Sequence, residues 1–169
     1  GLKPTHRQRL ARLYNRKVPS GVIVSRPLAT SLAELSREIG RQIGITLDRR
    51  GRVKHVIVGD ADQLFIPELG RARAGGGRFR GIRLVHTHLR EESLTQDDMT
   101  DLVRLRLDLI AAIGVRDDGR PGVMYHTYLL PHGSESACAE QVESENYEAL
   151  DFTGFIDALE SAFSRRTIG

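Results

Sequence analysis

The chain has one cysteine, no tryptophan and no long hydrophobic run. Because Cys138 stands alone, a disulfide framework and a cysteine-rich metal site are both excluded, and a reducing compartment fits this composition. No apolar stretch approaches the roughly 20 residues that span a bilayer, and no hydrophobic signal core follows the basic N-terminus. We therefore expect a cytoplasmic protein without membrane contact.

Aromatic residues make up only 5% of the chain, so its core must be mainly aliphatic. A length of 169 residues is enough for one compact domain. The apolar pattern predicts an amphipathic helix at 28–39, a β-hairpin at 43–58, and then a buried strand, a helix and a second buried strand between 82 and 115. We expect a single three-layer α/β domain over residues 1–169, with a mixed β-sheet flanked by helices.

Three further details are expected. They are a basic helix over residues 4–17, a short strand at 64–66, and a helix over 95–108 that buries Met99, Leu102, Val103 and Leu107 or their neighbours.

A further strand is expected at 123–130. There His126 alternates with polar neighbours, which favours an edge or surface position over a ligand position. Residues 131–150 are polar and acidic without a clear period, so we expect a loop or linker there before a last helix.

The net charge of +3 hides an uneven distribution. Residues 1–90 hold 19 Lys and Arg against 6 Asp and Glu, a net +13, whereas residues 91–169 hold 6 against 16, a net −10. Of the 25 cationic residues 22 are arginine, whose guanidinium binds phosphate bidentately and stacks on bases. The basic half therefore either faces RNA or forms ion pairs with the acidic half of the same chain.

Segment 70–83 combines five glycines, five arginines and one phenylalanine. Such a composition cannot bury much surface, so we expect an exposed, mobile loop. Its candidate RNA-contacting residues are Arg71, Arg73, Arg78, Arg80 and Arg83. The chain lacks the Gly-x-x-x-x-Gly-Lys-Ser/Thr loop that cradles nucleotide phosphates, so we expect no nucleotide bound by these 169 residues.

Two histidines stand at the end of the buried strand near 82–88. His86 and His88 are two residues apart and so face the same side of a strand. The next helix starts near Thr95, with Asp98 at capping-box spacing. Ligands of α/β proteins commonly bind beyond the carboxyl ends of strands, and imidazoles with a carboxylate are common zinc ligands. His86, His88 and Asp98 are therefore the candidate metal ligands.

A structural role for these three residues is the alternative. Asp98 can favour the helix dipole, and a histidine can hydrogen-bond the turn before the helix and fix its N-terminus. On that interpretation we expect weak zinc binding or none.

Four segments of the chain carry a family resemblance. They are Gly1-Leu-Lys-Pro4, Leu10 to Pro19, Ile57-Val-Gly-Asp60, and His86-Thr-His-Leu89 followed by Leu94 to Leu102. Taken in this order, they resemble the N-terminal extension of some bacterial HflX-type GTPases. The resemblance implies a longer parent protein that acts at the large ribosomal subunit, with GTP and Mg²⁺ bound by another domain. It implies for this chain an accessory role, in contact with ribosomal RNA or with the G domain of the parent.

The order helix, hairpin, His-x-His strand, Asp-bearing helix and buried strand is also similar to the JAMM metalloprotease fold. The zinc site of that family has the pattern His-x-His, seven residues, Ser, two residues, Asp. Here six residues separate His88 from Thr95, and Thr replaces Ser. The catalytic Glu of the family would fall near the start of the hairpin, where this chain has Arg41 and Gln42, with Glu38 one helical turn earlier. The zinc ligands would then lack a general base.

We therefore expect a non-catalytic accessory domain that has no catalytic residue and no cofactor of its own. The alternative is a JAMM-like zinc hydrolase that uses the three candidate ligands.

Overall fold

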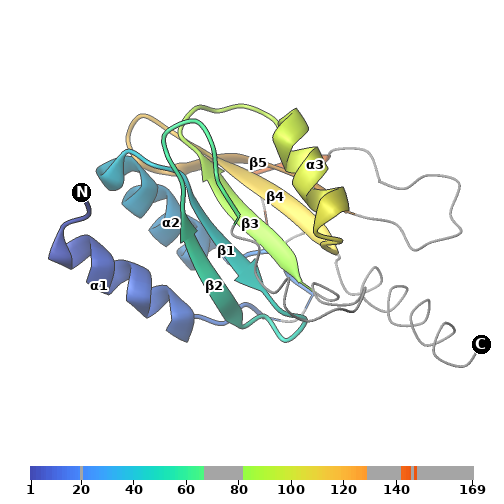
Figure 1. Ribbon diagram of the computed structural model, residues 1–169, viewed down its shortest axis with the longest axis horizontal. Coiled ribbons are helices and arrows are strands. Elements are labelled where there is room, and N and C mark those ends of the chain that lie inside the picture. The colour runs from blue at the N-terminus through green and yellow to red at the C-terminus, as the bar shows by residue number, and fades with distance from the viewer. Residues whose placement is uncertain (20, 67–81, 129–141, 146, 148–169) are drawn as a thin grey trace, which may run out of the picture.

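The computed structural model describes residues 1–19, 21–66, 82–128, 142–145 and 147, which contain one six-stranded sheet (Figure 1). The strand order is β2-β1-β3-β4-β5-β6. The strands are β1 (Ile43–Leu47), β2 (Val53–Val58), β3 (Arg83–His88), β4 (Leu109–Val115), β5 (Pro121–Tyr128) and β6 (Val142–Ser144). Because β3 and β4 are parallel and every other neighbouring pair is antiparallel, the sheet is mixed, as predicted.

Helices cover both faces of this sheet. The helices α1 (Pro4–Arg12), the 3-10 helix η1 (Leu13–Asn15) and α2 (Arg26–Ile39) lie on one side, and α3 (Gln96–Arg104) lies on the other (Figure 1). One core cluster packs α2 residues such as Leu32 against Ile45, and a second packs Leu102 of α3 against Leu84 and Ile110. The three-layer α/β architecture predicted from the sequence is confirmed.

Helix α2 follows its amphipathic pattern closely. Leu28, Leu32 and Leu35 repeat on one face and are at most 1% exposed. The helix ends at Gly40, whose φ of 71° is the left-handed conformation that closes many helices. One face of α2 is thereby buried on the central strands, and α1 packs beside it.

The predicted hairpin is confirmed, and its turn docks on the segment that follows η1. Val18 N donates to Gly51 O at 2.8 Å, and Gly51 N donates to Asp48 O at 2.9 Å. Gly51 has a φ of 79°, and a Cβ at this position would lie 2.0 Å from the carbonyl oxygen of Val18. Both the backbone conformation and the close contact therefore require glycine.

Helix α3 ends earlier than predicted, at Arg104 instead of Asp108. Arg106 adopts a left-handed φ of 54°, and Leu107 N donates to Leu102 O at 3.1 Å. This is a Schellman ending, in which an apolar contact between Leu102 and Leu107 closes the last turn. Val103 is 53% exposed, so its predicted burial is wrong.

No strand forms at 64–66, where one was expected. The carboxylate of Asp60 accepts hydrogen bonds from Asp62 N at 2.9 Å and Gln63 N at 2.7 Å, and this turn directs the chain away from the sheet edge. Phe65 is 60% exposed as a result.

Strand β6 lies inside the segment 131–150, where only a loop or linker was expected. It pairs with β5 and covers the edge of that strand, so His126 is 6% exposed instead of lying at an edge or surface. A strand of three residues is too short to show a hydrophobic period. The expected loop at 70–81 and the expected last helix lie outside the described residues.

No helix within the described ranges is long and apolar enough to cross a membrane.

The docking of the hairpin turn on Val18 can be tested with two glycine substitutions. Gly51→Ala should lower the free energy of unfolding by about 3 kcal/mol or more, because left-handed strain adds to a clash with the Val18 carbonyl. Gly40→Ala is the matched control, since Gly40 has a similar φ but open space around it; a loss of only about 1 kcal/mol is expected. Equal losses in urea unfolding would show that the clash is relieved without cost.

Candidate metal centre

Strand β3 holds the two candidate histidines in the middle of the sheet. It lies between β1 and β4, and all six of its residues are buried. His86 and His88 are each 1% exposed and face the α3 side, whereas Thr87 between them faces α2 and contacts Ser36 Oγ through its Oγ1 at 2.8 Å. The predicted same-face placement of the histidines is confirmed.

The first turn of α3 fixes the candidate carboxylate. Asp98 Oδ2 accepts from Thr95 N at 2.9 Å, and Asp98 N donates to Thr95 Oγ1 at 3.2 Å. This reciprocal capping box is the one predicted from the spacing of the two residues. Asp98 is only 8% exposed, so its carboxylate is held beneath the helix terminus, on the sheet.

The three predicted ligands converge. His86 Nε2 lies 2.9 Å from Asp98 Oδ1, and His88 Nε2 lies 3.2 Å from Asp98 Oδ2. The two Nε2 atoms are 3.0 Å apart. One ligand atom from each residue lies within 4.8 Å of the others, which is the geometry of a group that can hold a metal ion.

Hydrogen bonds alone cannot satisfy all three of these contacts at once. If both Nε2 atoms carry hydrogens toward Asp98, two N–H groups oppose each other at 3.0 Å. If one Nε2 is bare, it can accept from the other, but it then presents a lone pair to the carboxylate. A cation between the three atoms removes this conflict. Tetrahedral zinc with bonds of about 2.0–2.1 Å places two ligand atoms roughly 3.3 Å apart, close to these separations.

The backbone of Glu92 selects the tautomer of His88. Its carbonyl oxygen lies 3.3 Å from His88 Nδ1, and a carbonyl can only accept, so Nδ1 carries the hydrogen. A neutral His88 therefore has its lone pair on Nε2, which is the form that binds metal, with the outer nitrogen supported as in known metal sites.

This lone pair faces Asp98, so in the absence of metal the ring gains by taking up a proton. Burial opposes that charge, but the hydrogen bond and the charge of Asp98 outweigh burial and raise the pKa of His88. Burial likewise opposes the ionisation of Asp98. The charge and hydrogen bond of His86 and the hydrogen bond of His88 outweigh burial and hold the pKa of this carboxyl far below its usual range.

His86 lacks the same support. Its Nδ1 is buried and has no hydrogen-bond partner among the described residues. Loss of an outer partner commonly weakens metal affinity about 10- to 100-fold. The three side chains can thus hold a metal ion, but within the described residues only His88 of the two histidines has a partner on its outer nitrogen.

No general base reaches the three ligands from the positions named in the sequence. Glu38 is turned toward α1, where it pairs with Arg9 and lies 3.7 Å from His6. Arg41 donates to the carbonyl of Gly59. Gln42 is 4% exposed, and an amide cannot accept a proton from water at neutral pH.

The position of Gln42 is nevertheless informative. Gly44 pairs with His86 in the antiparallel register of β1 and β3. Two residues earlier, that register places Gln42 across from His88, on the face of the sheet that carries the histidines. The residue that the extended register sets across from His88 is therefore an uncharged amide.

Glu92 is a residue that the sequence did not mark as part of the site. Its Oε1 lies 3.9 Å from His88 Nδ1, on the side of the ring that faces away from Asp98. Its main contribution is a backbone carbonyl, which no side-chain pattern could have revealed.

The predicted RNA-contacting residues fall into two groups. Arg71, Arg73, Arg78 and Arg80 lie outside the described residues. Arg83 begins β3 and is 4% exposed, so the prediction that it contacts RNA is wrong for this residue. Burial lowers the pKa of its guanidinium to about 10, against the attraction of Asp48 and Asp108.

Comparison of the chain with protein-family models, curated proteins and solved structures finds no match.

The two roles of His88 predict opposite pH dependences. Without metal, its pairing with Asp98 stabilises fully below pH about 6.5, and this contribution is lost as pH rises through the raised folded pKa. With zinc, the stabilisation grows as pH rises, because metal competes with protons for Nε2. Urea unfolding of the chain and of His88→Ala, with chelator and with zinc, measures both trends. An identical pH trend in the two series would contradict zinc binding through His88.

Proposed function

We propose that this chain is a non-catalytic accessory domain of an HflX-type GTPase that acts at the large ribosomal subunit. The observation that carries the proposal is that the two histidines and the aspartate converge, while the register of β1 and β3, extended by two residues, sets Gln42 and not a carboxylate across from His88. Three candidate ligands without a carboxylate at positions 41 and 42 fit a binding role better than hydrolysis.

The proposal draws further support from the segments that carry the family resemblance. Leu10 and Leu13 pack into the core of the α2 side, and Ile57 packs with Leu94 and Leu102 on the α3 side. These positions belong to three of the four segments. The resemblance thus rests on residues that form one folded unit, to which GTP and Mg²⁺ would be external, bound by the G domain of the parent.

A deletion tests this role. Removing residues 1–169 from the parent GTPase should weaken its binding to large ribosomal subunits about tenfold or more, because one of two linked binding modules is lost. GTP hydrolysis in the absence of ribosomes should be unchanged. Co-sedimentation over a series of subunit concentrations measures the affinity, and unaltered affinity would refute the proposed role at the ribosome.

The convergence of His86, His88 and Asp98 supports a second candidate function, a JAMM-like zinc hydrolase. These residues would hold zinc through two nitrogens and one carboxylate oxygen, leaving a position for water. When bound, zinc would lower the pKa of that water and make it a nucleophile. The residues of this chain would orient the ligands, through the Thr95 capping box and the Glu92 carbonyl.

Metal analysis and one substitution distinguish the two functions. The hydrolase predicts about one zinc ion per chain, lost in His88→Ala and Asp98→Ala because each removes one of three ligands, whereas the accessory domain binds zinc weakly or not at all. The unmodified chain should not cleave a fluorogenic peptide library.

Gln42→Glu should introduce zinc-dependent cleavage, since it places a carboxylate across from His88. Arg41→Glu is the control, with the same new charge at the adjacent position. Cleavage by the unmodified chain would overturn the accessory assignment and establish the hydrolase.

A further inference from the structure

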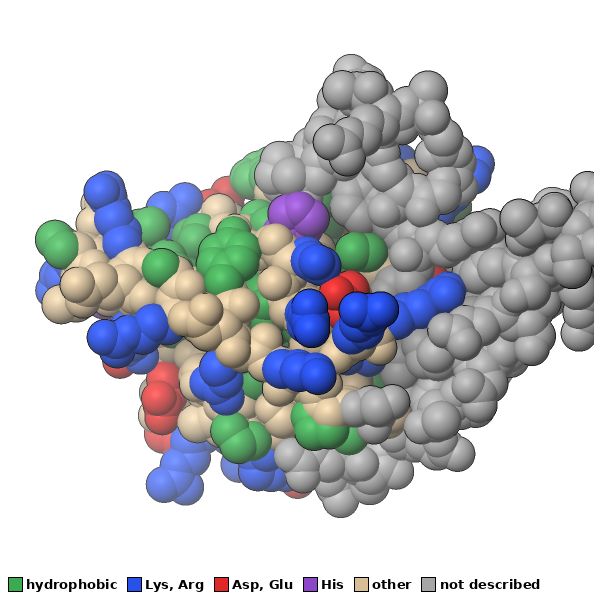
Figure 2. All heavy atoms as spheres, turned by 90° about the horizontal axis from the view of Figure 1, so that it is seen from below, with side chains coloured by type: hydrophobic (Ala, Val, Ile, Leu, Met, Phe, Trp, Pro, Cys, Tyr) green, Lys and Arg blue, Asp and Glu red, His purple; other side chains and the backbone are tan. Residues whose placement is uncertain are grey.

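Lys and Arg side chains gather on the face of the molecule seen from below, at the end of the sheet where the β1–β2 turn lies (Figure 2). We call this the basic edge. It is formed by the outer side of β2, the β1–β2 turn and the residues that follow η1. Its cationic residues are Lys17, Arg49, Arg50, Arg52 and Lys54.

Part of this charge is already neutralised. Arg49 lies 3.6 Å from Asp108, and Lys54 lies 3.7 Å from Asp48. The side chains of Lys17, Arg50 and Arg52 are exposed, and none has an acidic partner within 4.0 Å in the described part of the chain. The surface thus keeps three uncompensated positive charges.

The backbone holds two of these cations side by side. Lys17 and Arg52 form an antiparallel bridge, which joins the segment after η1 to the start of β2. Two like charges on paired backbone positions repel each other, and an anion between them relieves that repulsion. The pair therefore favours a phosphate-bearing ligand.

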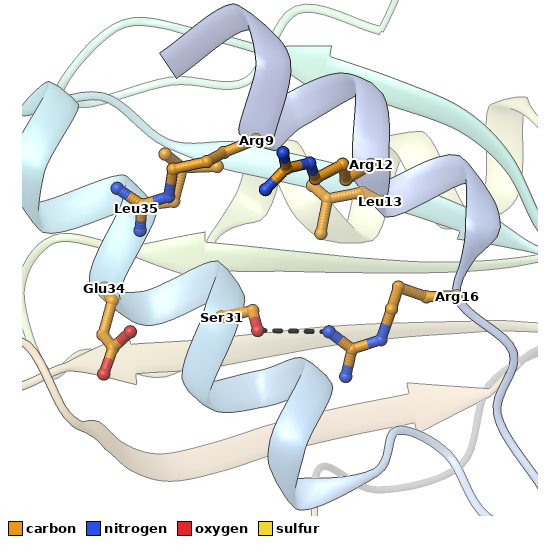
Figure 3. Close-up of a pocket in the computed structure, with 7 residues that line it drawn as sticks. All are labelled: Arg9, Arg12, Leu13, Arg16, Ser31, Glu34 and Leu35. Atoms are coloured by element: carbon orange, nitrogen blue, oxygen red, sulfur yellow. Dashed lines mark hydrogen bonds between the residues drawn. The ribbon is translucent and has the colours of Figure 1, made fainter. Parts of the chain in front are cut away.

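The same row of cations continues into a hollow of about 170 Å³ between α1, η1 and α2 (Figure 3). Arg12 and Arg16 line it from one side and Ser31 from the other, and Arg16 Nη1 donates to Ser31 Oγ at 3.3 Å. Arg12 has no ion pair among the described residues. Glu34 also lines the hollow, so its carboxylate disfavours an anion inside it.

An aromatic ring lies beside this basic edge. Tyr14 of η1 is 50% exposed, and its hydroxyl accepts a hydrogen bond from Val56 N at 3.2 Å. This bond ties the ring to the outer backbone of β2, two residues from Lys54. A half-exposed ring anchored on β2 beside the basic edge can stack a nucleobase while the cations hold phosphates of the same strand.

We propose that the basic edge binds single-stranded RNA, with Lys17, Arg50 and Arg52 on phosphates and Tyr14 stacked on a base. The aromatic ring favours RNA over an acidic peptide, because a peptide needs the charge and gains little from a stacking surface. This inference rests on the proposed function, in which the large ribosomal subunit is the partner. It places the contact on folded residues at the opposite end of β3 from the histidines.

The charge part of the proposal is tested by salt dependence. Binding of a fluorescent single-stranded RNA of mixed sequence is measured by anisotropy over a salt series. Replacing Lys17, Arg50 and Arg52 together with Ser should reduce the slope of log affinity against log salt by about 2, since each lost phosphate contact in a single strand contributes roughly 0.7.

A second triple variant removes the same charge elsewhere. Arg90, Arg116 and Arg120 are exposed and lie at the histidine end of the sheet. Their replacement by Ser should leave the salt slope unchanged. Equal reductions in the two triple variants would overturn the proposal, because they would show that net charge alone governs binding. Urea unfolding confirms that each variant is folded.

The stacking part is tested at Tyr14. Tyr14→Leu should weaken RNA binding about 5- to 150-fold, the usual effect of losing one stacked base. Tyr14→Phe keeps the ring and should retain most of the affinity. If leucine and phenylalanine bind RNA equally well, the ring is not a stacking surface and the proposal fails.

The ribosome assay separates this inference from the proposed function. If the Lys17, Arg50 and Arg52 variant of the parent loses oligonucleotide binding and ribosome binding, the proposed function and the basic edge are both supported. If the chain binds RNA through the basic edge while deletion of residues 1–169 leaves ribosome binding intact, the inference stands and the role at the ribosome fails. If the deletion weakens ribosome binding but the triple variant does not, the role stands and the basic edge is refuted as the contact.

Discussion

The α3 side of the molecule depends on the contacts that one carboxylate makes, that of Asp98. It accepts from the Thr95 backbone, faces both histidine rings of β3, and thereby joins the start of a helix to the middle of the sheet. A buried carboxylate is stable only when its charge is compensated, and here the compensation comes from protons on the rings or from a metal ion. The start of α3 and the chemistry of the site therefore depend on the same carboxylate.

Much of the fold could be predicted because its signals are local. The period of Leu28, Leu32 and Leu35 identifies α2, and the uninterrupted aliphatic run at 109–115 identifies a strand covered on both faces. The candidate ligands were predictable for the same reason, because alternation along a strand and capping-box spacing are both properties of short sequences. Convergence of the two motifs then follows from β3 lying beneath α3.

The remaining features depend on contacts between distant segments. Burial of His126 requires β6, a strand of three residues whose sequence has no detectable period. The early end of α3 depends on Arg106 in a conformation that arginine rarely adopts, which helix propensity opposes. Burial of Arg83 depends on Asp48 and Asp108, which approach it from other elements. In each case tertiary contacts outweigh a local preference.

Thr87 joins the central strand to the helical layer on the α2 side. Its Oγ1 accepts from Ile43 N at 3.0 Å and contacts Ser36 Oγ at 2.8 Å, so one hydroxyl links α2, β1 and β3. The peptide groups on either side of Thr87 carry the two histidine rings on the other face. One strand position therefore ties α2 to the sheet on one face while its two neighbours form the candidate metal centre on the other, so a substitution at Thr87 would disturb both layers.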